Sequence, residues 1–141
     1  MRPFFTMTDE AALAHALIKA YKMGFVQFHV VPHNVANHLG ERPAVSELAR
    51  FQLQQDTCAT SQLHTSVDFP DPFQRHLVLL LDGTRDRQML AREMMTFVKS
   101  GRGTVYKKGT RVEDPDELET IVEQRLREDL ECLMREGMLV P

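Results

Sequence analysis

The sequence contains little cysteine, no long apolar run and no strong excess of either charge. Its two cysteines, Cys58 and Cys132, lie far apart and form no Cys-x-x-Cys pair. This spacing predicts neither a disulfide framework nor a zinc site, so we interpret both side chains as buried free thiols in a reducing cytoplasm. No stretch reaches the roughly 20 apolar residues needed to cross a bilayer, and no membrane partner is expected.

The charge balance is close to neutral. The formal net charge is −3 for 141 residues, and the isoelectric point is about 6.1. Such a chain has no overall attraction to polyanions, which disfavours nucleic acid as a partner. The acidic Asp9 and Glu10 come too early for a signal peptide, so a cytoplasmic location is expected.

The sequence does contain enough apolar material for a core. It is 43% hydrophobic and 26% charged, which is typical of globular rather than disordered chains. The length fits one ordinary domain or two very small ones. We expect an N-terminal helix-strand unit over residues 1–40 and a larger domain over residues 41–141, joined near a polar loop that contains Gly40 and Pro43.

Two adjacent patterns predict the N-terminal unit. Apolar residues recur at helical spacing over residues 8–23, at Leu13, Leu17, Ile18 and Tyr21. Gly24 is placed to end this helix. β-Branched and aromatic residues then alternate with polar ones over residues 25–31, which predicts a strand.

Apolar periodicity, caps and turns predict the elements of the larger domain. They are a helix over 46–55 capped by Ser46, a loop over 56–61, a strand over 62–67, a helix over 73–81 capped by Asp71 or Asp68, a helix from Thr84 to Gly101, a hairpin over 103–112, a helix over 114–136 and a short strand over 138–141. Thr84 is the predicted cap of its helix, and the run 77–81 should be deeply buried. Leu48 and Phe51 should lie on the narrow apolar face of the first helix.

This order of elements predicts an α+β fold that is mostly helical. A helix, a tight turn, a second helix, a hairpin, a long helix and a short strand form the layout of a winged-helix-like domain, with the hairpin as the wing. The small helix-strand unit precedes it.

Three histidines, His29, His33 and His38, lie near the loop between the two parts. Neutral imidazole is a common zinc ligand, but their spacing matches no metal motif and no acidic or cysteine residue stands beside them. We therefore predict surface or packing roles and no bound metal.

A second polar group holds Ser61, His64 and Ser66. A nucleophile requires an oriented base and an oxyanion site, and the sequence has no Gly-x-Ser-x-Gly turn to supply them. It also lacks a Gly-x-Gly-x-x-Gly motif and a P-loop. The sequence thus predicts no catalytic residue, no nucleotide cofactor and no enzymatic activity of its own.

The densest polar signal is the turn formed by Asp82, Gly83, Thr84 and Arg85. Clustered carboxylate and guanidinium groups can mark a site, but a turn followed by a helix needs these same residue types. We interpret the four residues as a structural turn and cap.

Basic residues gather on or near the predicted wing. Lys107, Lys108 and Arg111 belong to the hairpin, and Lys99 and Arg102 precede it. On a winged helix they could touch phosphates, but the neighbouring helices carry acidic residues, which favours a solvated basic wing over a DNA contact.

Several stretches carry a resemblance to a known family. Residues 42–52, residues 60–67 and above all residues 79–87 resemble the C-terminal winged-helix region of bacterial protein-lysine methyltransferases with a methyltransferase regulatory domain. The Asp114-Pro115 helix start and the ending over residues 137–140 fit as well. In that family S-adenosylmethionine reacts in a separate Rossmann-like domain, which this sequence lacks, so no family catalytic residue can be assigned here.

The resemblance implies a non-catalytic accessory or regulatory module that contacts a protein, either a methyltransferase domain or a substrate. One alternative is a DNA-binding winged-helix regulator, and another is a peptide-binding module, because Leu-Asp-Gly-Thr-Arg is similar to a turn in winged-helix proteins that bind leader peptides. Self-association through an edge strand is also open. A protein-binding role favours an exposed apolar patch, for which the candidates are Phe4, Phe5, Phe25 and Phe28, although core positions are the commoner use of such residues.

Overall fold

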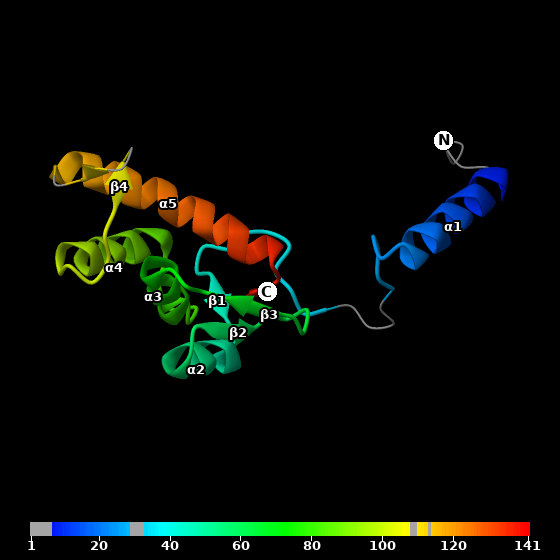
Figure 1. Cartoon of the computed structure of the whole chain (residues 1–141), viewed down its shortest axis with the longest axis horizontal. Coiled ribbons are helices and arrows are strands. Elements are labelled where there is room, and N and C mark those ends of the chain that lie inside the picture. Colours follow the sequence, from blue (N-terminus) through cyan, green and yellow to red (C-terminus); the bar gives the residue numbers. More distant parts are fainter. Residues whose placement is uncertain (1–6, 29–32, 108–109, 113) are drawn as a thin grey trace. The chain divides into compact units, whose positions relative to one another are not determined.

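The computed structural model describes residues 7–28, 33–107, 110–112 and 114–141 (Figure 1). The chain divides into two compact units, residues 1–32 and residues 33–141. The first unit holds one described helix, and the second holds the other described helices and all described strands.

Helix α1 (Met7–Lys22) confirms the predicted N-terminal helix. Acidic residues lie in its first turn and basic residues in its last, as the helix dipole favours. Gly24 follows it with φ of 77°, a left-handed conformation that glycine adopts without strain. The apolar side chains of α1 are exposed, with exposed fractions from 39% for Leu17 to 53% for Leu13 and Tyr21.

The predicted strand over residues 25–31 is wrong in its described part. Residues 25–28 form no strand, and residues 29–31 lie outside the described residues. A strand needs a pairing partner, and none of the described strands pairs with this segment. Phe28 instead places its ring 5.2 Å from that of Tyr21.

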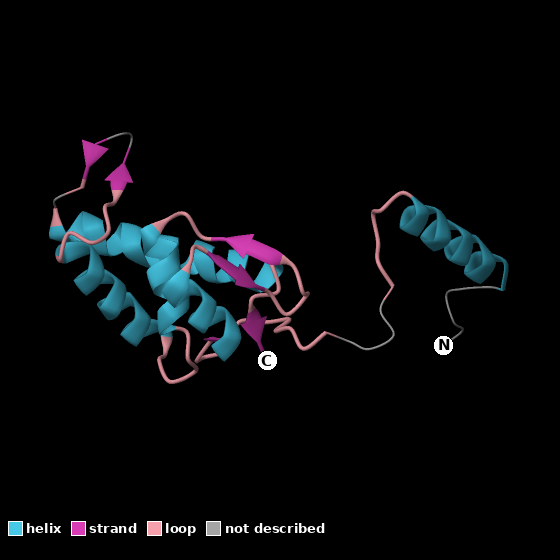
Figure 2. Ribbon diagram, turned by 60° about the horizontal axis from the view of Figure 1, so that its bottom comes forward, coloured by secondary structure: helices cyan, strands magenta, loops and turns pink. Residues whose placement is uncertain are grey.

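The second unit combines packed helices with short antiparallel strand pairs (Figure 2). Its helices are α2 (Glu47–Gln55), α3 (Pro72–Leu80), α4 (Arg87–Lys99) and α5 (Pro115–Arg135). The strand pairs are β1 (Ala44–Val45) with β6 (Leu139–Val140), β2 (Cys58–Thr60) with β3 (Ser66–Asp68), and β4 (Tyr106–Lys107) with β5 (Thr110–Arg111). The predicted α+β, mostly helical fold is confirmed, as is the hairpin between α4 and α5.

The β1–β6 pair joins the two ends of this unit. Val45 pairs with Leu139, and the Val45 amide donates to the carbonyl of Leu81 over 2.8 Å. The sequence predicted the closing strand but not β1. Two residues directly before a helix cap are too few to show the alternation by which strands are recognised.

The β2–β3 pair corrects two predictions. Residues 58–60, predicted as loop, form β2, and the strand predicted over residues 62–67 begins only at Ser66. The Ser61 hydroxyl accepts from the amides of Leu63 and Thr65, which closes a turn where a strand was expected. Cys58 on β2 is exposed and Cys132 only half-buried, so the prediction of two buried thiols is wrong.

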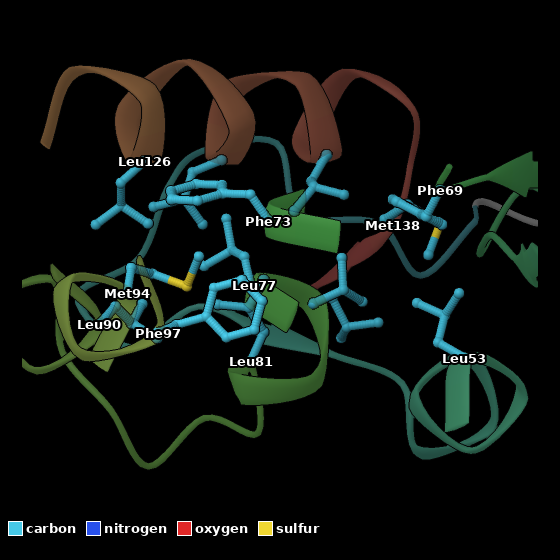
Figure 3. Close-up of a cluster of buried hydrophobic side chains, with 14 of the residues drawn as sticks. Leu53, Phe69, Phe73, Leu77, Leu81, Leu90, Met94, Phe97, Leu126 and Met138 are labelled. Carbon is cyan, nitrogen blue, oxygen red and sulfur yellow. The ribbon is translucent and has the colours of Figure 1, made fainter. Parts of the chain in front are cut away.

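The core lies between α3, α4 and α5 (Figure 3). Helix α5 supplies its predicted stripe in full, Leu118, Val122, Leu126, Leu130 and Leu133. Helix α4 likewise buries Leu90, Met94, Phe97 and Val98, as predicted. Of the run 77–81, Leu77, Val78 and Leu81 are fully buried, while Leu79 and Leu80 are only partly covered.

Carboxylate and hydroxyl caps fix the helix starts. Ser46, Asp71 and Asp114 each accept a hydrogen bond from a first-turn amide of the helix that follows, as predicted. The prediction that Thr84 caps α4 is wrong. Asp86 is the cap, accepting from the Met89 amide over 2.8 Å, because α4 begins at Arg87, three residues after Thr84.

The face that α2 turns to the core also differs from the prediction. Leu48 and Phe51 are 59% and 60% exposed, whereas Ala49 and Leu53 are buried. The helix packs on β2, to which it is fixed by Gln52: its amide group accepts from the backbone of Thr60 and donates to the Thr60 hydroxyl. Burying Gln52 against β2 leaves the Leu48 and Phe51 side in solvent.

Candidate functional site

A groove runs between α4 and α5 and is built from two adjoining hollows of about 550 and 200 Å³, while a third hollow of about 610 Å³ adjoins it between residues 39–41 and the start of α4. Neighbouring hollows share lining residues, and Gln88 lines all three. Its apolar lining consists of Leu39, Ala91, Met95, Leu126 and Leu130. We call this feature the α4–α5 groove.

The spacing of residues on the two helices creates the groove. One wall of the groove is a row of α4 residues at helical intervals, namely Gln88, Arg92, Met95 and Lys99. This row lies next to the buried apolar stripe of the same helix. Ala91 lies in the middle of this wall. Its short side chain leaves open the space between the helices that a larger residue would fill.

In the larger hollow the two walls carry opposite charge, whereas in the smaller hollow the α5 wall carries both Glu123 and Arg127. Arg92 and Lys99 stand on the α4 wall, and Glu119 and Glu123 stand on the α5 wall. Among the described residues none of these four side chains forms an ion pair or a hydrogen bond, so the walls do not close on each other. At the other end of the groove, Arg87 donates to the carbonyl of Leu39 over 3.5 Å.

The predicted turn brings Asp82, Thr84 and Arg85 together. The Asp82 carboxylate accepts from the Thr84 hydroxyl at 2.6 Å, the Thr84 amide at 2.9 Å and the Arg85 guanidinium at 2.6 Å. The Thr84 bonds, and then Arg85, hold the pKa of Asp82 well below its usual range. Gly83 adopts φ of 82°, and Arg85 also donates to the Leu80 carbonyl, so the turn ties the end of α3 to the start of α4.

The described basic residues near the hairpin belong to different elements. Lys107 is on β4 and Arg111 on β5, while Lys108 lies outside the described residues. Lys99 belongs to the groove wall, and the Arg102 guanidinium lies 5.3 Å from the centre of the Phe97 ring. A phosphate contact by the hairpin stays a prediction.

The histidine and serine groups take local roles where they are described. His38 pairs with the side chain of Asn37 at 2.9 Å, while His29 is outside the described residues. Ser61 is buried and its hydroxyl bonds to that of Thr65, whereas His64 is an exposed turn residue with φ of 58°. In the part of the chain that is described, no three His, Cys, Asp or Glu side chains converge closely enough to hold a metal ion.

A charged cluster that sequence reasoning missed joins α5 to the start of α3. Arg125 forms ion pairs with Asp71 and Asp129, and its guanidinium lies 4.4 Å from the centre of the Phe73 ring. Burial raises the pKa of Asp129 to about 6, because the attraction of Arg125 only partly offsets desolvation and the charge of Asp71. These contacts hold α5 against the start of α3.

Exposed large apolar residues gather on α1 in the first unit and on α2 in the second. The α1 surface comprises Leu13, Leu17, Ile18 and Tyr21, and Phe25 and Phe28 after the helix are 75% and 58% exposed. Two of the four predicted patch aromatics are therefore exposed, and Phe4 and Phe5 lie outside the described residues. Leu48 and Phe51 form the smaller surface on α2.

The groove is the feature that the sequence analysis did not find. Its signal is the row of Gln88, Arg92, Met95 and Lys99 beside the apolar stripe of α4. Such a row resembles any solvated helix face until the position of the second helix is known.

None of the described helices is long and apolar enough to cross a membrane.

Comparison with known proteins identifies the larger unit. The family model described as "PKMT, C-terminal winged helix domain" matches residues 41–138. No curated protein matches the chain. The predicted winged-helix fold and the predicted resemblance to the methyltransferase family are confirmed.

Two solved structures of PKMT2 from Rickettsia typhi share the fold. The structure in complex with AdoHcy is 22% identical with a TM-score of 0.85, and the match covers 100% of this chain and 28% of that one. The second is 22% identical with a TM-score of 0.87 and covers 98% and 29%. The chain thus spans less than a third of the length of the PKMT2 chains.

Proposed function

Because the chain belongs to the family of C-terminal winged-helix domains of protein lysine methyltransferases, we propose that it is a non-catalytic accessory module of such an S-adenosylmethionine-dependent enzyme. It helps to recognise the protein substrate or regulates the catalytic domain. The family match over residues 41–138 is the observation that carries this proposal. Its two free cysteines suit a reducing cytoplasm.

The α1 surface supports a contact with the catalytic part of the enzyme. Burying a single leucine or isoleucine side chain contributes about 1.5–3 kcal/mol, and α1 exposes Leu13, Leu17 and Ile18 together. An apolar surface of this kind is typical of a lasting protein interface.

The lack of a cofactor-binding motif in this sequence supports a non-catalytic role. The R. typhi PKMT2 structure contains AdoHcy, and this chain resembles only 28% of that protein. The sequence here has no glycine-rich turn between a strand and a helix of the kind that binds such cofactors. Calorimetry of the chain with S-adenosylmethionine is therefore expected to show no binding.

Association with a methyltransferase tests the proposal. The enzyme is a family member from the organism that encodes this chain, with its own winged-helix domain removed. Sedimentation velocity should show a complex with the chain, and methyl transfer to protein lysines should change when the chain is added. Duplex DNA should not bind at physiological salt.

A pair of variants on α1 shows whether the α1 surface forms the contact. Leu17→Lys should abolish the complex, whereas His15→Lys, on the polar side of the same helix, should leave it intact. The proposal fails when the wild-type chain forms no complex, or when the chain alone transfers methyl groups to lysine.

A further inference from the structure

We infer that the α4–α5 groove docks an amphipathic helical segment of the protein substrate, with acidic and basic residues on opposite edges of that helix. The inference rests on the proposed function and names the site at which the substrate is held. The segment is a docking element and is distinct from the lysine that receives the methyl group.

The length and lining of the groove suit a helix. From Gln88 to Lys99 the α4 wall extends about 16 Å, at 1.5 Å per residue, which equals about three turns of a bound helix. The apolar lining, Ala91 and Met95 from α4 with Leu126 from α5, offers contact to one row of apolar side chains. Binding of an apolar helix face in such a groove is a common mode of peptide recognition.

The charges of the walls select the edges of the bound helix. Arg92 and Lys99 would meet carboxylates on one edge, and Glu119 and Glu123 would meet lysine or arginine on the other. These four wall side chains have no partner among the described residues, so binding would not have to break existing ion pairs. The larger hollow of the groove is thus complementary to a helix that carries acidic residues on one edge and basic residues on the other.

The polar walls also favour a substrate over the catalytic domain as the occupant. Lasting interfaces within an enzyme are largely apolar, whereas partners that come and go use an apolar centre with a charged rim. The α1 surface is of the first kind and the groove of the second. A substrate has to dissociate after each turnover, and the charged rim of the groove is typical of such a transient interface.

A designed peptide pair tests the charge rule directly. The probe is a fluorescein-labelled helix of about 18 residues with a leucine row, a glutamate edge and a lysine edge, long enough to be helical. The control peptide has the same composition with both charges mixed on each edge. A peptide with the glutamate and lysine edges exchanged would be no control, because that helix could bind in the reverse direction and form the same charge pairs. Fluorescence anisotropy should give at least about tenfold tighter binding for the segregated peptide.

Variants of the chain locate the site. Ala91→Leu fills the middle of the groove with a good helix former and should weaken binding about tenfold or more. Arg92→Glu should weaken it several-fold, whereas Arg75→Glu on α3, outside the groove, should not. In spectra of ¹³C-methyl methionine the Met95 signal should shift with peptide, while Met89, exposed on α4 outside the groove, should not. Equal binding of both peptides, or an unmoved Met95 signal, would overturn the inference.

A methylation assay links the groove to the substrate. With the probe sequence fused to a lysine-rich reporter, the complex of chain and truncated methyltransferase should show a KM several-fold lower than with the mixed-charge fusion, at similar kcat. Ala91→Leu should abolish this difference while still forming the complex. A complex that forms normally but treats both fusions alike contradicts the groove inference alone. Failure to form any complex contradicts the proposed function first.

Discussion

Helices α1 and α5 show the same kind of apolar stripe but differ in what covers it. The α5 residues Leu126, Leu130 and Leu133 are at most 4% exposed, whereas Leu13 and Leu17 of α1 are 53% and 39% exposed. The stripe predicts that a helix has an apolar side, and it does so correctly for both. It carries no information on whether the covering surface is in the same unit or in another protein.

The difference has an energetic consequence. Helix α5 is held by the core and by the ion pairs of Arg125, while α1 has 16 residues, a length at which an isolated helix is only marginally stable in water. Several exposed leucine and isoleucine side chains on such a helix therefore indicate a binding surface. This contrast is the physical basis for assigning α1 to the methyltransferase contact.

The most severe test of this contrast truncates one leucine in each helix environment. Leu130→Ala, in the buried stripe of α5, should lower the unfolding free energy of the second unit by about 2–5 kcal/mol. Leu17→Ala on α1 should change it by less than about 0.5 kcal/mol, because no core contact is lost. Urea unfolding followed by circular dichroism measures both, and similar losses in the two variants would remove the distinction.

The pH dependence of stability should sharpen the description of how α5 is anchored. Asp129 has a pKa of about 6 in the folded protein, against 3.8 for the ordinary group, so the folded state binds the proton more tightly than the unfolded chain. The unfolding free energy should therefore fall as pH rises from about 4 to about 6. Asp129→Asn should flatten this part of the profile, and Glu131→Gln, an exposed change on the same helix, should leave it as it is.

The start of α4 offers a finer test of how helices of the second unit are fixed. Asp86→Ala removes the cap and should lower the unfolding free energy by about 1 kcal/mol. Thr84→Ala removes only a bond to Asp82 within the turn, and its effect should be smaller. Asp86→Ala should therefore have the lower midpoint of unfolding in urea. A lower midpoint for Thr84→Ala would instead indicate that Thr84 is the cap.

The sequence predicted what depends on neighbours along the chain and missed what depends on packing. The start of α4 was placed too early, at Thr84, but the caps Ser46, Asp71 and Asp114 follow from local chemistry, and they were predicted correctly. The orientation of α2 was not, because it depends on Gln52 bonding to Thr60 of a strand that was itself missed. The groove was missed for the same reason: Met95 and Leu126 line it together only once α4 lies beside α5.

Hydrogen–deuterium exchange of α1 would show directly whether this helix binds the methyltransferase. The chain is measured alone and with the family methyltransferase that lacks its own winged-helix domain. We expect rapid exchange of the amides over residues 7–22 in the free chain and strong protection in the complex, with the buried stripe of α5 protected in both. Unchanged exchange of α1 in the presence of saturating enzyme would contradict the assignment of this chain as a docked accessory module.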